Sequence, residues 1–222
     1  MFFLIEFLIY FAYLYMDISG IFPNVSSLLK FLSIALCFYH IDKNNYSIKY
    51  IMFLTVISDF FLVLTDMYHI GVFCFIFVQL GYYCHITSFF SFSYTARHLS
   101  LVLLCSIIAG FIANLFIMHI GLLEFFAITY FFMLIYNIFL LSINLHTGIL
   151  LQIKLNHQEA FVFLICLILI LCCDIHVAVT NIFSSGIWFN FGQIAMWLFY
   201  LPSQVIISLL YGTKSQYSRI LF

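Results

Sequence analysis

The sequence contains little charge: 7% of its 222 residues are Asp, Glu, Lys or Arg, whereas 66% are hydrophobic. A water-soluble domain of this length is excluded, because such domains carry about a quarter of their residues as charges. The formal net charge is −1 and no charged tail is present, so nothing indicates a nucleic-acid partner. The composition therefore predicts an all-α, polytopic membrane protein.

Signatures of other membrane enzymes are also missing. No two histidines lie four residues apart, the spacing that binds zinc on a helix face, which disfavours metal-dependent ceramidase or site-2 protease chemistry. The sequence lacks Gly-x-Ser-x-Gly and Gly-x-Ser-Gly motifs for a serine nucleophile, and Gly-x-Gly-Asp of intramembrane aspartyl proteases. Two intramembrane aspartates keep that last class as a distant option. We predict chemistry without a metal or other cofactor.

The seven cysteines are scattered through apolar runs and form no Cys-x-x-Cys pair. Buried free cysteine usually behaves as a small hydrophobic residue. We therefore expect neither disulfides nor a metal cluster.

Hydropathy predicts a bundle of eight transmembrane helices, because spans of about 17 to 25 apolar residues recur along the chain. The predicted spans are residues 2–16, 22–40, 50–65, 70–87, 99–118, 123–144, 160–180 and 187–211. The first residues lack a basic segment and a small-residue cleavage site, so this end is interpreted as a retained span and not a signal peptide. Residues 1–222 are thus expected to form a single transmembrane domain.

Basic residues indicate the orientation, because cytoplasmic loops concentrate Lys and Arg. In the eight-span arrangement, six of them fall on one side: Lys43, Lys49, Arg97, Lys154, Lys214 and Arg219. This pattern predicts that both termini are cytoplasmic. A seven-span alternative without the first helix would keep the same inner loops and place the N-terminus outside. Richness in Ile, Phe, Tyr and Asn favours a bacterial cytoplasmic membrane as the location of this integral cell-membrane protein.

Two acidic residues interrupt or end long apolar runs. Asp59 lies within the run 50–64, and Asp174 follows the run 161–173. An acidic residue at the centre of a membrane helix costs about 2.5 to 3.5 kcal/mol on insertion scales, so such residues predict a functional site by default.

Other polar residues lie at comparable depths in the predicted spans. Helix rise places most of them about 9 to 17 Å from the cytoplasmic ends and Asp174 at about 18 to 22 Å, so they could share one layer. The shallower group is Asp59, Gln79, Tyr82, Tyr200 and Gln204. In the last span, polar and aromatic residues repeat at steps of three and four, which predicts a stripe facing protein or a cavity. That stripe is Gln193, Trp197, Tyr200, Gln204 and Ser208. By contrast, His176 lies on nearly the opposite side of its helix from Asp174 and is a poor partner for it.

Two blocks carry a family resemblance. The first is Ser58-Asp59-Phe60-Phe61-Leu62, followed by Gly71, Phe75, Gln79 and Tyr82; the second is Cys173-Asp174-Ile175-His176-Val177-Ala178 with Tyr200-Leu-Pro-Ser-Gln204. Together they resemble the lysoplasmalogenase, or YhhN-like, integral membrane proteins. That family has eight predicted spans and hydrolyses vinyl ether lysophospholipids. This chain departs from its pattern in having Ser58 for Gly, Cys173 for Ser and Gln79 for His, and Gln cannot shuttle a proton.

The resemblance implies a membrane hydrolase that acts on a lysophospholipid in the bilayer. Cleaving a vinyl ether requires one acid and one base, because protonation gives an oxocarbenium-like cation to which water adds. Asp59 and Asp174 are the predicted catalytic pair, with the two roles unassigned. Predicted substrate-binding residues are Gln79, Tyr82, Tyr200, Gln204 and Lys30.

Structural and non-enzymatic interpretations remain open for the same residues. Asp59 and Asp174 could bond neighbouring helices or pair with Lys30. Lys30 itself is expected to extend to the outer interface, or else to bind a lipid phosphate. Glu6 is expected near the interface.

A small-solute transporter or lipid-binding protein could use the same polar cavity. In that case Pro202 and Gly192 could mark a bent gating helix. A transporter would require bound solute or ion to depend on the two aspartates, whereas an enzyme would require product.

Overall fold

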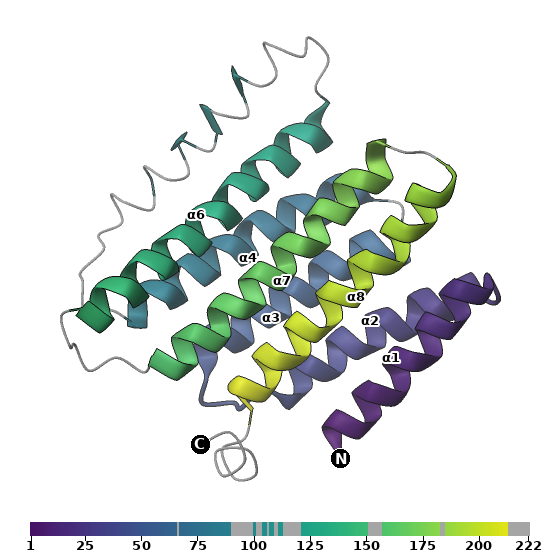
Figure 1. Cartoon of the computed structure of the whole chain (residues 1–222), viewed down its shortest axis with the longest axis horizontal. Helices are drawn as coiled ribbons and strands as arrows, with labels where there is room; N and C mark the ends of the chain where they lie inside the picture. The colour runs from purple at the N-terminus through teal and green to yellow at the C-terminus, as the bar shows by residue number, and fades with distance from the viewer. Residues whose placement is uncertain are drawn as a thin grey trace. The chain divides into compact units, whose positions relative to one another are not determined.

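The computed structural model describes residues 1–65, 67–89, 100, 104–105, 107–108, 111–112, 121–150, 157–182 and 185–212. The elements in this part are α1 (Phe2–Ser19), α2 (Pro23–His40), α3 (Tyr46–Asp59), the π-helical turn η1 (Phe60–Leu64), α4 (Tyr68–Phe89), α6 (Leu122–Leu150), α7 (His157–Ile182) and α8 (Ile187–Leu210) (Figure 1). The prediction of an all-α fold is therefore confirmed for these residues.

Six of the seven α-helices in the described ranges are long and apolar enough to cross a membrane, with η1 completing the α3 span. The chain is accordingly an integral, multi-pass membrane protein. The second helix is not among the six, although at 18 residues it is as long as α1, because Asn24, Lys30 and three serines lower its hydropathy. The predicted fifth span, 99–118, lies almost wholly outside the described residues, as do Arg97, Lys154, Lys214 and Arg219, on which the predicted orientation depends.

The connection between α1 and α2 is a tight hairpin with identifiable stop and start signals. Gly20 adopts a left-handed conformation with φ 69° and donates its N–H to the Met16 carbonyl, which closes the end of α1. Pro23 occupies the first turn of α2, where its missing N–H removes no helical hydrogen bond. The two helices consequently run antiparallel.

The helices group into two compact units. The first comprises Met1–Asn45 and Ile165–Phe222, and contains α1, α2, most of α7 and α8. Within it, α2 packs against both α1 and α8. The C-terminal end of α8 is tied to the chain after α2 by a bridge between Ile41 and Gly212, and by Asn45, whose Nδ2 donates to the Tyr211 carbonyl at 2.9 Å.

Residues 176–192 of this unit show a close approach of α7 and α8. A Cβ atom on Gly192 would lie 2.6 Å from Thr180 Cγ2 and 3.3 Å from the His176 carbonyl oxygen. The helix α8 continues as a single α-helix through both Gly192 and Pro202. Close helix packing therefore accounts for a glycine at position 192.

The second unit, Tyr46–Leu164, has α4 packed against both α3 and α6. Its α4 and α6 run parallel, because Phe73 contacts Phe126, Phe75 contacts Tyr130 and the Gln79 backbone contacts Asn137. Parallel neighbours have the end of one helix and the start of the next at opposite ends of the pair.

Glycines allow the close contact of α3, η1 and α4. A Cβ atom on Gly71 would lie 2.5 Å from Leu62 Cγ and 3.1 Å from the Ser58 carbonyl oxygen, and one on Gly81 would lie 2.5 Å from Ile51 Cγ1. Small residues at a membrane helix interface permit the backbone approach on which packing in lipid depends.

We expect Gly71→Ala to destabilise the protein by about 1 to 3 kcal/mol, because the added methyl group overpacks a contact that includes backbone. Thermal unfolding of the detergent-solubilised protein measures the effect. Gly121→Ala is the matched control, since its Cβ would meet only the flexible Glu124 carboxylate. Equal stability of the two variants would contradict the proposed packing role.

Candidate functional site

Asp59 is the last residue of α3 and is only 2% exposed. Immediately after it the chain changes from α-helical to π-helical winding over Phe60–Leu64. Single π-helical turns are rare and occur frequently at functional sites. The predicted catalytic aspartate thus lies in the interior at a local irregularity of a membrane span.

The residues beside Asp59 join α3 to α4. The hydroxyl of Ser58 donates a hydrogen bond to the Gly71 carbonyl oxygen. Both residues belong to the first block of the family resemblance, so the serine that replaces the family's glycine has a structural partner. Position 58 is completely buried, and its hydroxyl would be costly there without a partner.

Gln79 is 1% exposed and is held by a residue that the sequence analysis did not select. Asn137 on α6 donates its Nδ2 to both the Gln79 backbone oxygen and Gln79 Oε1, at 3.0 Å each. The side-chain oxygen of Gln79 is therefore engaged in joining α4 to α6. Tyr82, one turn later and 1% exposed, packs its ring edge-to-face on Phe163 at 5.4 Å between centroids.

Tyr200 and Gln204 lie on the buried face of α8, at 7% and 1% exposure. Ser203 Oγ donates to the Tyr200 carbonyl at 2.6 Å, and Gln204 Nε2 donates to Ser203 Oγ at 3.3 Å. Gln204 Oε1 is buried and has no hydrogen-bond partner within the described part of the chain. The predicted stripe was wrong at its first member, because Gln193 is exposed.

Asp174 lies on α7 and is partly exposed, in contrast to Asp59. His176 makes local contacts: its Nδ1 lies 2.7 Å from the Cys172 carbonyl oxygen, and its ring stacks on Phe199 at 5.4 Å. Asp59 belongs to the second unit and Asp174 to the first. Their pairing in one site stays a prediction.

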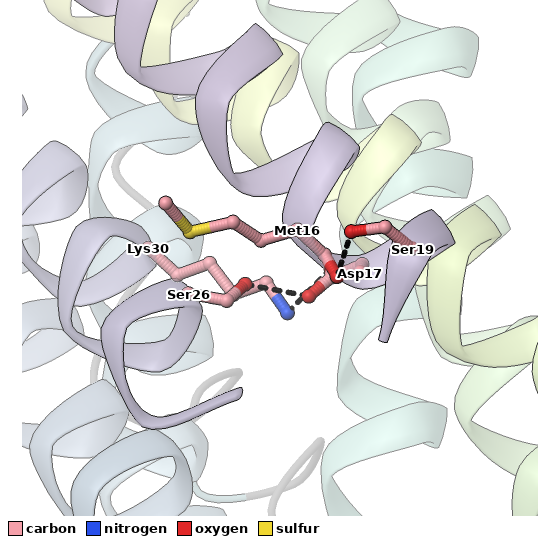
Figure 2. Close-up of polar contacts among 5 residues, drawn as sticks. All are labelled: Met16, Asp17, Ser19, Ser26 and Lys30. Carbon is pink, nitrogen blue, oxygen red and sulfur yellow. Dashed lines mark hydrogen bonds and ion pairs between the residues drawn. The ribbon is translucent and has the colours of Figure 1, made fainter. Parts of the chain in front are cut away.

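Lys30 is where the structure departs most from expectation. Its ammonium does not end in water at the outer interface: the residue is 9% exposed and forms an ion pair with Asp17, with Nζ 2.7 Å from Oδ2 (Figure 2). The other Asp17 carboxylate oxygen accepts a 2.5 Å hydrogen bond from Ser26 Oγ. Both oxygens of this carboxylate are thus engaged by α2, and Lys30 extends toward the hairpin turn, as a helical side chain leaning toward its N-terminus should.

Aromatic rings surround the same ammonium. Lys30 Nζ lies 5.6 Å from the centroid of the Tyr13 ring and 5.0 Å from that of Trp197. Both distances are within the range of cation–π attraction. Trp197 in turn contacts the Tyr200 ring edge-to-face at 5.5 Å. Two of the predicted binding residues, Lys30 and Tyr200, therefore both contact Trp197.

A second buried acid lies farther along the same two helices. Glu6 is 2% exposed and accepts a hydrogen bond from Ser33, with Cys37 Sγ 4.0 Å from its other oxygen. The prediction that Glu6 lies near the interface stays a prediction, but its carboxylate is buried against polar partners on α2. We call this set the α1–α2 seam, which comprises Glu6, Tyr13, Asp17, Ser26, Lys30, Ser33 and Cys37.

The seam left a signal in the sequence. Its members on α2 follow steps of four, three and four residues, which place them on one helix face: Ser26, Lys30, Ser33 and Cys37. Asp17 was missed because it follows the predicted end of the first span at residue 16, whereas α1 continues to Ser19.

Within the described residues, no group of three or more His, Cys, Asp or Glu side chains could hold a metal ion. None of the seven cysteines forms a disulfide. Comparison with protein-family models, curated proteins and solved structures finds no match for this chain.

We expect Asp17→Asn to destabilise the protein by about 3 kcal/mol, because it leaves the buried Lys30 charge without its counter-ion. Lys30→Gln should have a similar effect. The double variant should recover most of the loss, since neither charge then remains. Thermal unfolding in detergent of both single variants and the double variant gives the coupling energy, and additive losses would rule out the buried pair.

Asn137→Ala should destabilise by about 1 to 3 kcal/mol, because Gln79 Oε1 would then be buried without a donor. Asn144→Ala is the control: Asn144 is on the same helix and its Nδ2 donates only to the Leu140 carbonyl one turn away. Unfolding midpoints that fall equally in both variants would refute a role for Asn137 in joining α4 to α6.

Proposed function

We propose that the chain is a membrane hydrolase of the lysoplasmalogenase type, which cleaves the vinyl ether bond of lysoplasmalogens to a fatty aldehyde and a glycerophospholipid. The observation that carries the proposal is Asp59, a carboxyl group 2% exposed next to a π-helical turn inside a membrane span. Such a group is expensive in lipid and is most readily explained by chemistry. The two sequence blocks around Asp59 and Asp174 supply the reaction type.

The reaction needs a proton on carbon and a water on the neighbouring carbon. An acid protonates the β-carbon of the vinyl ether, which produces an oxocarbenium ion stabilised by a nearby carboxylate. Water then adds to the cation and gives its proton to the base. The resulting hemiacetal then breaks its bond to the glycerol oxygen: its hydroxyl loses a proton, the glycerol oxygen gains one, and the aldehyde and the free glycerol hydroxyl are released. The proton held by the base returns to the acid, which restores both groups. One water is consumed, and no metal or redox partner takes part in these steps.

Burial suggests how the roles divide. Asp59 is the proposed proton donor, because its burial at 2% exposure limits exchange of the proton with solvent. Asp174, which is partly exposed, is the proposed carboxylate that handles water. Tyr82, Tyr200 and Gln204 are the proposed donors to the ether oxygen, the glycerol hydroxyl or the water. Gln79 can contribute only its amide nitrogen as donor, because its oxygen accepts from Asn137.

The proposal includes the complete topology of eight spans in the cell membrane, with both termini cytoplasmic and a bacterial cytoplasmic location. The parallel direction of α4 and α6 supports it, because an odd number of crossings must separate parallel spans. Six helices that satisfy length and hydropathy supply most of the count.

Detergent-purified protein is expected to release aldehyde from alkenyl lysophosphatidylethanolamine or alkenyl lysophosphatidylcholine, with or without chelator. Asp59→Asn and Asp174→Asn should each lower the rate at least about a hundredfold, the scale of general acid–base catalysis. Asp42→Asn is the matched control, because Asp42 lies in the loop after α2 and its carboxylate accepts from the Asn44 N–H. Folding is checked by unfolding midpoints.

Absence of turnover of both lipids by a well-folded wild type would refute the hydrolase. The non-enzymatic alternative, a lipid-binding or small-solute transport protein with the same buried polar residues, would then take first place. Full activity in either Asp variant would instead refute that residue's catalytic role.

A further inference from the structure

We infer that the end of the α1–α2 seam nearest the Gly20 hairpin is a binding site for a zwitterionic phospholipid head group, one that carries both a phosphate and an ammonium. The site consists of Asp17, Ser26 and Lys30 with the rings of Tyr13 and Trp197. The inference names the head group that the substrate of the proposed hydrolase would carry. It rests on the proposed function for the choice of a lysophospholipid.

The depth of the site suits a head group. Asp17 precedes the hairpin residue Gly20 by three positions, so it lies about 4 to 5 Å along the helix axis from the turn. The side chains of Lys30 and Asp17 keep 11% and 17% exposure, so the ion pair is reachable from the surface although mostly buried. Lipid head groups occupy the interfacial layer, where the ends of spanning helices lie.

The ion pair within the site already has the two kinds of charge that the ligand carries, an ammonium and an anionic group. The Lys30 ammonium sits against a carboxylate and two aromatic faces, which is the environment that binds ammonium groups of ligands. An incoming ammonium can take that place beside Asp17. The phosphate can then become the partner of the displaced Lys30.

This exchange leaves no buried charge alone. Each charge of the ion pair changes one oppositely charged partner for another, whereas removing a partner from a buried charge is strongly unfavourable. A phosphate lipid without an ammonium would leave Asp17 unpaired, and a lipid with neither charge could not open the pair at all. The site therefore discriminates by the cost of the wrong ligand as well as by attraction to the right one.

The Tyr13 hydroxyl is a further polar group in the site that could bind such a ligand. Tyr13 is fully buried, and its hydroxyl has no hydrogen-bond partner among the described residues. A buried hydroxyl without a partner is unfavourable. A phosphate oxygen drawn to Lys30 would offer it an acceptor.

Tryptophan fluorescence provides the measurement. The chain has two tryptophans, Trp188 and Trp197, and Trp188 is 60% exposed. In the full-length Trp188→Phe protein, Trp197 alone reports the departure of Lys30 from its ring. The probe is acyl lysophosphatidylethanolamine, whose ester link contains no vinyl ether, compared with lysophosphatidic acid and monoacylglycerol of the same chain length.

We expect the ethanolamine lipid to bind at least tenfold more tightly than either comparator. Asp17→Asn should weaken it at least tenfold while affecting lysophosphatidic acid less, because Lys30 remains to bind phosphate. Lys30→Gln should weaken both phosphate lipids. Asp42→Asn should leave all three affinities unchanged.

The double variant Asp17→Asn with Lys30→Gln guards against misfolding, because it leaves no unpaired charge. It should bind the three lipids with equal affinity. Equal binding of the three lipids by wild type, or a preference for the ethanolamine lipid that survives in the double variant, would overturn the inference. The probe is not a vinyl ether, so binding and hydrolysis are measured separately. Selective binding without aldehyde release would show that the proposed function fails while this site stands. Aldehyde release without the preference for the ethanolamine lipid would show the reverse.

Discussion

A charge placed in lipid must find an opposite charge or a set of hydrogen bonds within the protein, and the first unit is built around that requirement. The Lys30–Asp17 ion pair meets it with Ser26 completing the carboxylate and two aromatic rings around the ammonium. Because the pair joins α1 to α2 and Trp197 belongs to α8, one electrostatic requirement connects three helices. It also bears on the low hydropathy of α2, because three of its polar residues, Ser26, Lys30 and Ser33, are buried within the unit.

The second unit meets the requirement for buried polar partners in a different way. Its α3 and α4 approach closely because Gly71 and Gly81 leave room for Leu62 and Ile51. Hydrogen bonds between uncharged groups then join the helices and give partners to buried backbone and hydroxyl atoms. Ser58 bonds the Gly71 carbonyl, and Asn137 bonds Gln79 twice. Neutral hydrogen bonds between membrane helices are individually modest, so close packing must supply much of the stability there.

Hydropathy predicted the helices because apolar length is a local property. When η1 is counted with α3, the seven described helices coincide with seven of the eight predicted spans to within a few residues, except where α6 extends to Leu150. Partners are not local. Predicting that Lys30 meets Asp17 required knowing that α1 continues to Ser19 and that the hairpin brings residues 17 and 30 into register. The partners of Glu6 were likewise not predicted, because Ser33 and Cys37 come from another helix. Four of the predicted site residues are buried, namely Asp59, Gln79, Tyr82 and Gln204. Asn137 was not predicted, because a lone Asn in an apolar span has no distinguishing pattern.

Buried acids in this chain therefore need not share one explanation. Glu6 and Asp17 have partners on a neighbouring helix that account for their retention, and an ion pair can often be replaced by apolar residues of similar volume without loss of fold. The role proposed for Asp59 is of another kind, because a carboxyl group that supplies a proton to substrate cannot be replaced by an apolar residue without loss of that chemistry. The distinguishing property of Asp59 is thus its place beside a π-helical turn, a backbone irregularity that hydrogen bonding between helices does not require. Burial alone would rank Glu6 beside Asp59; burial together with the local backbone separates them.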